Sequence, residues 1–108
     1  MTNPQNIPAK LRKKDLGEKI EAACKKNDVT FMAIFGSYSR GEQRRGSDLD
    51  IAIEYQKGKK KSLFDLVDLE EDLSRIFGKK VDLGIFHSLN RYVIGQVKKE
   101  MKVIYEKR

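Results

Sequence analysis

The sequence predicts a small α/β domain in which helices pack around a mixed β-sheet of three to four strands. Three apolar runs, at about 29–35, 48–55 and 80–86, are rich in β-branched or aromatic residues and have the length of strands. The stretches around them repeat apolar residues every three or four positions, which is typical of amphipathic helices. A chain of 108 residues can bury one core. We therefore expect a single domain over residues 1–108.

Helical and loop signals in the first third of the chain precede the first strand. Residues 1–7 are polar and predict a flexible leader. A helix is expected from about Pro8 to Asn27, since proline suits the first helical position. Its apolar stripe is Leu16, Ile20, Ala23 and Cys24. Cys24 is the one cysteine, so we expect a buried structural thiol and no internal disulfide, as is typical of a reducing compartment.

The rest of the chain alternates helical and strand patterns. A short helix is expected to begin at Ser37, after the first strand. Ser62 and Asp65 have the spacing of a capping box, and Gly78 suits the end of the helix that follows. That helix is expected to be mostly core, through Leu63, Leu66, Val67, Leu73, Ile76 and Phe77. A last helix over about 88–100 and a short edge strand over 101–105 complete the prediction.

Chemistry-bearing residues gather where the first strand ends and the second begins. Gly36 and Ser37 form a turn that opens a helix, whose free N–H groups and positive dipole end favour phosphate. Asp48 and Asp50 share one face of the second strand, because successive side chains alternate. Two such carboxylates repel unless a cation lies between them, and Mg²⁺ prefers this ligand type. The combination indicates nucleotide chemistry; the alternative is a strand edge solvated by two aspartates.

A third carboxylate, Asp82, interrupts the third apolar run. An acid at such a position is costly to bury without a partner. If its strand lies beside that of Asp48 and Asp50, the three carboxylates converge. Gly84 would then leave room for substrate on the same face. The alternative is that Asp82 forms an ion pair with Lys79, Lys80 or an arginine.

Three motifs carry a family resemblance. Gly36-Ser37, Arg40-Gly41 and Ser47-Asp48-x-Asp50 resemble the G-S-x-x-x-G … S-D-x-D signature of the nucleotidyltransferase superfamily that includes DNA polymerase β. At this length the chain is similar to the minimal nucleotidyltransferases of the MNT type, which are antitoxin partners of HEPN-domain toxins. The resemblance covers roughly residues 30 to 105. It implies a small nucleotidyltransferase fold in which an acid on a neighbouring strand completes the metal site, a place that Asp82 matches.

The resemblance and the motifs together imply Mg²⁺-dependent transfer of AMP from ATP to a hydroxyl. Asp48, Asp50 and Asp82 are the expected catalytic residues and ligands of two Mg²⁺ ions. The expected nucleotide-binding residues are Gly36, Ser37, Arg40 and Ser47. Arg44 or Arg45 could take the place of Arg40, and Ser47 could instead be a turn residue beside Asp48. The resemblance also implies the acceptor, a tyrosine of a HEPN toxin.

Other functions and partners are weighed against this one. A non-catalytic antitoxin could occlude its partner, and a transferase could act on a small molecule or an RNA end, guided by the lysine-rich loop 57–61. The formal charge of +7 favours a polyanionic partner, but no stacking motif or recognition helix indicates nucleic acid as the direct target. We expect a nucleoside triphosphate as ligand, a cytoplasmic location, and no membrane contact. Self-association is left open.

Overall fold

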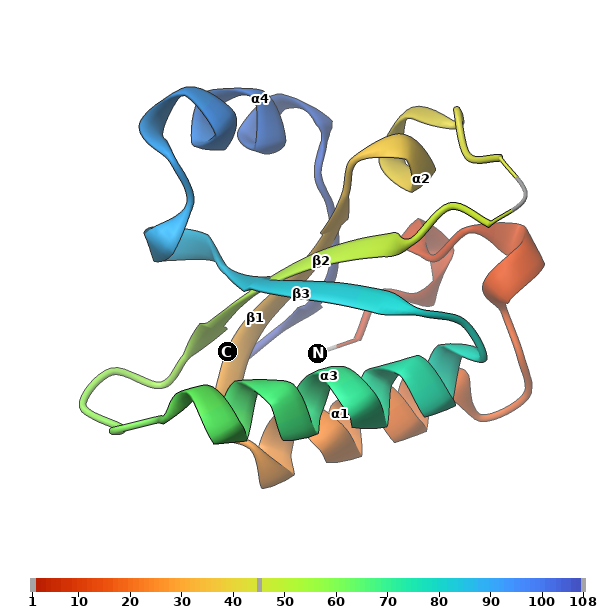
Figure 1. Ribbon diagram of the computed structural model, residues 1–108. Helices are drawn as coiled ribbons and strands as arrows, with labels where there is room; N and C mark the ends of the chain where they lie inside the picture. The colour runs from red at the N-terminus through yellow and green to blue at the C-terminus, as the bar shows by residue number, and fades with distance from the viewer. Residues whose placement is uncertain (1, 45, 108) are drawn as a thin grey trace.

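The computed structural model describes residues 2–44 and 46–107 and is built on a four-stranded mixed sheet (Figure 1). The strand order is β3-β2-β1-β4, in which β1 pairs antiparallel with β2 and β4, and β2 pairs parallel with β3. The strands are β1 Val29–Phe35, β2 Leu49–Tyr55, β3 Val81–Ile85 and β4 Lys102–Glu106. The predicted α/β class with a mixed sheet is confirmed.

The helices cover the two faces of the sheet unequally. Figure 1 shows α1 (Leu16–Lys26) and α3 (Leu63–Phe77) side by side on one face, and α4 (Arg91–Glu100) above the other. The short helix α2 (Ser37–Arg40) follows β1 at the upper edge of the sheet. Short 3₁₀ turns are formed by Pro4–Asn6, Ala9–Leu11 and Phe86–Ser88. No described helix has the length and apolar character needed to cross a membrane.

The main core lies between the sheet and the pair α1 and α3. Alternate residues of β2 point into it, and Leu49, Ile51 and Ile53 are completely buried. The four residues of the predicted stripe on α1 are buried as well. Burial raises the pKa of the Cys24 thiol to about 12, so this cysteine is an inert core residue, as predicted.

The opposite face of the sheet carries a smaller apolar cluster. It is centred on Ala52 of β2, Phe86 and Val97 of α4. Val97 is the only buried residue of α4. The other side chains on this face of β2 are Asp50 and Glu54, which also alternate with the core residues. This face is therefore thinly covered, and it is the face that carries the predicted acids.

Two predictions for the N-terminal part of the chain are wrong. Residues 2–7 are not a loose leader: Thr2 bridges Tyr105, the Asn6 side chain donates to the Val103 carbonyl oxygen at 2.7 Å, and Ile7 is completely buried. The first α-helix begins at Leu16 and not near Pro8. The left-handed backbone of Asp15 (φ 63°) separates it from the preceding 3₁₀ turn. Burial of the apolar Ile7 side chain therefore holds this segment against the domain, although most of its residues are polar.

Helix α3 begins and ends as predicted but is less buried than predicted at its start. The Ser62–Asp65 capping box is formed, and Gly78 ends the helix with a φ of 72°. Leu63 and Val67, which we predicted to be core, are exposed.

Side chains of α3 also satisfy the outer edge of β3. The Ser74 hydroxyl accepts from the Val81 N–H and the Glu70 carboxylate from the Leu83 N–H, both at 3.0 Å. Because β3 is an edge strand, these N–H groups have no strand partner on that side. The two bonds flank Asp82 and hold its strand against α3.

Substitution Glu70→Ala is expected to destabilise the protein and loosen β3. Loss of a hydrogen bond to a charged acceptor costs on the order of 1 kcal/mol, or roughly 4–8 °C in Tm for a domain of this size. Thermal unfolding measures the loss, and amide exchange at Leu83 reports the edge directly. Glu71→Ala, on an exposed neighbour, is the control and should leave both unchanged. Equal effects of the two substitutions would contradict this role for Glu70.

Candidate active site

The three predicted carboxylates lie together on the thinly covered face of the sheet. Asp50 of β2 and Asp82 of β3 are direct neighbours in the parallel register, and Asp48 precedes Asp50 on the same side. Partial burial raises the pKa of the Asp50 carboxyl, and the negative charges of Asp82 and Asp48 raise it further, whereas Arg40 lowers it. The fold therefore holds like-charged carboxylates close together. Groups with pKa values perturbed in this way are typical of active sites.

The glycine-serine turn is placed against one of these carboxylates. Phe35, the last residue of β1, is paired with Asp50, so the turn that follows begins beside it. Gly36 has a φ of 74°, and a Cβ atom there would lie 2.3 Å from the Asp50 Oδ2 atom. Only glycine fits this backbone and this contact. Ser37, half-buried, then opens α2. The predicted phosphate seat and the carboxylates thus form one site.

Arg40 is held by two glutamates, one of which the sequence gave no reason to connect with it. Its Nε atom lies 2.9 Å from Glu42 Oε1, and its Nη1 atom lies 2.9 Å from Glu100 Oε2. Hydrogen bonds to these carboxylates raise the pKa of Arg40, and the Arg40 guanidinium lowers the pKa of Glu100. The arginine therefore joins α2, which follows the Gly36-Ser37 turn, to the end of α4. Glu42 could be found from its spacing, whereas Glu100 has no local signal.

Ser47 and two lysines complete the surroundings of Asp48. The Ser47 hydroxyl accepts from the Arg44 N–H at 2.8 Å, so this serine shapes the turn before Asp48, the alternative that the sequence left open. Lys80 Nζ lies 3.8 Å from Asp48 Oδ2, whereas Lys79 contacts the Tyr38 hydroxyl and ring of α2. The two lysines suggested as alternative partners of Asp82 thus contact other residues.

The donor set fits a hard cation. Asp48, Asp50 and Asp82 offer only carboxylate oxygens, the ligands that Mg²⁺ prefers. Among residues 2–44 and 46–107, no three acidic, histidine or cysteine side chains converge tightly enough to enclose an ion. His87, the one histidine, pairs with Glu54 at 2.8 Å.

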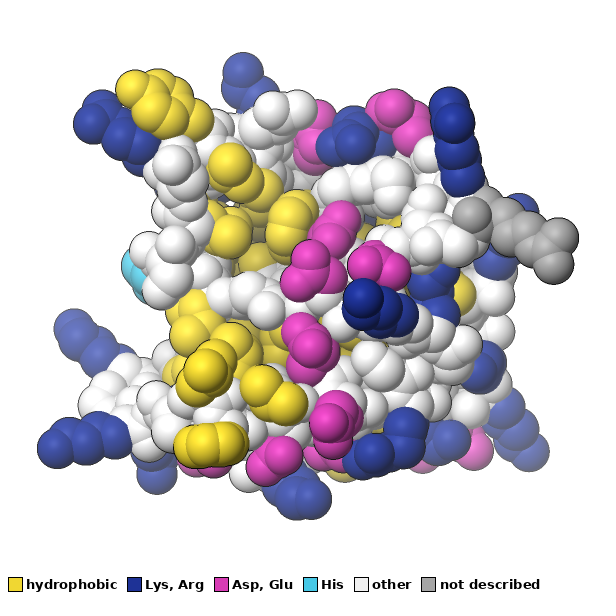
Figure 2. All heavy atoms as spheres, in the orientation of Figure 1, with side chains coloured by type: hydrophobic (Ala, Val, Ile, Leu, Met, Phe, Trp, Pro, Cys, Tyr) yellow, Lys and Arg dark blue, Asp and Glu magenta, His cyan; other side chains and the backbone are white. Residues whose placement is uncertain are grey.

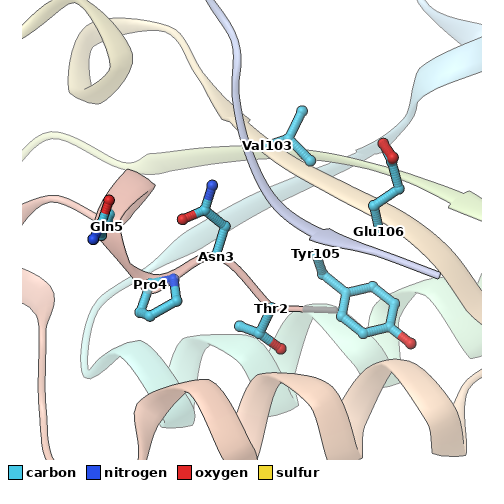
Figure 3. A pocket seen from close by; sticks show the side chains of 7 residues that line it. All are labelled: Thr2, Asn3, Pro4, Gln5, Val103, Tyr105 and Glu106. Atoms are coloured by element: carbon cyan, nitrogen blue, oxygen red, sulfur yellow. The ribbon is translucent and has the colours of Figure 1, made fainter. Parts of the chain in front are cut away.

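A surface pocket lies away from this site, between the N-terminal segment and β4 (Figure 3). Its volume is about 490 Å³, and it is lined by Thr2, Asn3, Pro4, Gln5, Val103, Tyr105 and Glu106. It shares no residue with the carboxylate cluster, and β1 separates β4 from β2. The pocket therefore contributes nothing to the chemistry of the three aspartates.

Comparisons with known proteins show the family of this chain and the fold that it shares. The family model described as polymerase beta, nucleotidyltransferase, matches residues 18–108. A Methanocaldococcus jannaschii protein assigned as a protein adenylyltransferase is 41% identical over 76 residues, which cover 70% of this chain and 80% of the relative. The protein adenylyltransferase MntA of Thermococcus cleftensis is 36% identical over 73 residues, covering 68% and 72%. A crystal structure of a toxin–antitoxin complex with AMP-PNP superposes with a TM-score of 0.69 at 26% identity, covering 85% of this chain and 74% of the other.

Alanine at Gly36 is expected to disrupt the site beyond its cost in stability. Gly41→Ala is the matched control, because Gly41 also has a positive φ (71°) but open space where a Cβ would lie. Gly41→Ala costs about 1 kcal/mol of left-handed backbone strain. Gly36, with a ψ of −151°, lies in a region open essentially to glycine alone, so strain from Gly36→Ala is larger, about 1–3 kcal/mol. Only Gly36→Ala also displaces the Asp50 carboxylate. Titration with Mg²⁺-ATP should show binding lost in Gly36→Ala and kept in Gly41→Ala. Equal nucleotide affinities would contradict the contact between the turn and Asp50.

Asparagine at Asp50 is expected to stabilise the metal-free protein. The fold disfavours the charged form of this carboxyl, as its raised pKa indicates, so a neutral isostere should raise Tm. Asp68→Asn, on the exposed face of α3, is the control and should leave Tm unchanged. Added Mg²⁺ should stabilise the original protein more than Asp50→Asn. A lower Tm for Asp50→Asn without metal would contradict the repulsion argument.

Proposed function

Since this chain belongs to the polymerase β-type nucleotidyltransferase family, we propose that it is an antitoxin that transfers AMP from ATP to a tyrosine of a HEPN-domain toxin. One observation carries the proposal: the Gly36 turn lies so close to Asp50 that only glycine fits between them. A triphosphate seated on that turn would place its α-phosphorus beside the three carboxylates. The same arrangement suits AMP transfer to any hydroxyl, so the acceptor needs its own argument.

Each site residue has a proposed role. Asp48, Asp50 and Asp82 would hold two Mg²⁺ ions, which neutralise phosphate charge and acidify the attacking hydroxyl. Gly36 lets the triphosphate approach the backbone, and the Ser37 N–H and hydroxyl donate to its terminal phosphates. Arg40 balances negative charge on the departing pyrophosphate.

Charges near the carboxylates support these proposed roles. Arg40 already lowers the pKa of Asp50, so its positive charge acts at the site. Lys80, beside Asp48, adds a second positive charge at the entrance. We assign Ser47 an indirect role: it shapes the turn that presents Asp48 to the nucleotide.

A protein acceptor is favoured by the relatives of this chain. The MntA relative is named a protein adenylyltransferase, and the structural neighbour with AMP-PNP is a toxin–antitoxin complex. Both support a toxin as the acceptor, and the MNT-type signature supports the HEPN class. The location we propose is the cytoplasm, where ATP is available.

Label transfer tests the proposal. Purified protein, Mg²⁺ and ATP labelled on the α-phosphate are incubated with the product of the adjacent gene, which the proposal expects to be a HEPN-domain protein. Label should enter a tyrosine of that protein, and Asp48→Ala/Asp50→Ala should reduce the rate by at least about 10³-fold, because removal of the charged ligands removes the electrostatic stabilisation of the transferring phosphoryl group. Asp68→Ala is the control and should retain full activity.

Three outcomes would contradict the proposal. Label transfer that persists in the double variant would remove the carboxylates from the chemistry. Neutralisation of the toxin at full strength by the same variant would favour an antitoxin that only occludes its partner. Labelling of an RNA end or of a small hydroxyl compound, with the toxin unlabelled, would assign a different acceptor.

A further inference from the structure

The described residues expose five large hydrophobic side chains, and all lie on two helices. Leu63, Phe64 and Val67 belong to the first turns of α3, and Tyr92 and Val93 to the first turn of α4. Phe64 is 81% exposed and Tyr92 is 82% exposed. Single exposed apolar residues are ordinary, but five gathered on two helix starts are typical of an interaction site.

The fold fixes these side chains outward. At α3 the Ser62–Asp65 capping box sets the first turn, so Leu63 and Phe64 cannot rotate into the core. At α4 the Asn90 side chain accepts from the Tyr92 N–H and caps that helix in the same way. Because Val97 is the only buried residue of α4, this helix leaves most of its apolar surface uncovered.

Helices α3 and α4 pack on opposite faces of the sheet (Figure 1), but both groups of exposed side chains lie on one side of the molecule (Figure 2). In Figure 2, hydrophobic side chains gather over α4 and over the start of α3, beside a column of acidic side chains that runs down the middle of the view. Helix α3 is tied to β3 by the bond from the Leu83 N–H to Glu70, one residue from Asp82. A protein that covered the two helix starts would therefore reach the carboxylates with its own surface.

The charges around the apolar residues favour an acidic partner. Exposed Lys57, Lys59 and Lys60 precede α3, and the Arg91 guanidinium lies 5.8 Å from the centre of the Tyr92 ring. A second copy of the chain would bring its own net charge of +7 against this rim, and like charges oppose association. Nucleic acid is disfavoured because the aliphatic members, Leu63, Val67 and Val93, offer no ring on which a base could stack.

We propose that Leu63, Phe64, Val67, Tyr92 and Val93 form the docking surface for the acceptor protein, whose matching surface is apolar with an acidic rim. This inference rests on the proposed function, since it assigns the acceptor's seat beside the proposed active site. The lysine-rich loop at 57–61 contributes the basic rim of the surface. Docking there brings the acceptor hydroxyl to the carboxylate cluster.

Binding of the adjacent gene's product, expected to be a HEPN-domain protein, tests the surface separately from the chemistry when it is measured without nucleotide. Phe64→Ser/Tyr92→Ser removes one aromatic anchor from each helix, and both positions lie in first turns, where serine is tolerated. Affinity should fall by about tenfold or more, because buried aromatic anchors dominate interface energies. Glu18→Ser, in the first turn of α1, is the matched control and should bind as the original protein does.

A charge variant tests the rim. Lys60→Glu should slow association and weaken its dependence on salt, whereas Lys10→Glu, an equal charge change on the 3₁₀ turn Ala9–Leu11, should not. All variants should retain the Tm and the Mg²⁺-ATP affinity of the original protein, since none lies in the proposed nucleotide site.

The remaining outcomes separate the two proposals. Unchanged binding by Phe64→Ser/Tyr92→Ser overturns the docking surface and leaves the proposed chemistry intact. If binding depends on the proposed docking surface but the original protein transfers no label, the proposed AMP transfer is overturned and the docking surface is supported. Failure of the original protein to bind the HEPN protein overturns the choice of partner. If sedimentation shows a dimer that Phe64→Ser/Tyr92→Ser abolishes, the surface binds a second copy of the chain and not the acceptor. If the protein binds RNA and the same variant abolishes that binding, the surface binds RNA and not the acceptor.

Discussion

The structure depends on hydrophobic burial along β2, which fixes a strand register that holds two like charges side by side. Asp50 and Asp82 occupy paired positions of parallel strands, where their repulsion would favour a different register. Leu49, Ile51 and Ile53 prevent that change, because a slip by one residue would bury the acids and expose the core. Hydrophobic burial on one face thus sustains electrostatic strain on the other. A cation and a triphosphate could relieve this strain, which makes the site receptive to them.

Local signals were sufficient for most of the fold and for the centre of the site. The strand Val29–Phe35 and the helix Leu63–Phe77 have the predicted bounds, because β-branched runs and capping residues act over a few positions. The pairing of Asp50 with Asp82 followed from reasoning about a neighbouring strand, which was a topological guess that the sheet bears out. Their role as metal ligands stays a prediction, since geometry alone assigns no ion.

The misses share a different physical origin, which is contact between distant parts of the chain. Proline at position 8 is a helix-start signal, but burial of Ile7 and the left-handed Asp15 place the helix later. The bond from Arg40 to Glu100 spans 60 positions and has no local trace. Leu63 and Val67 fit a helical stripe perfectly, yet they are exposed, because a stripe shows which side of a helix is apolar and not what covers it.

That last miss connects the fold to its proposed use. A chain of this length forms one substantial core, and α1 and α3 complete it on a single face of the sheet. The other face receives only α4, whose one buried residue leaves the carboxylates accessible. Full cover by this chain's own helices would block the acids from any acceptor. The apolar residues at the starts of α3 and α4 stay exposed on the side of the molecule that also presents acidic side chains (Figure 2). A protein that brings its own hydroxyl would cover them and complete the proposed site.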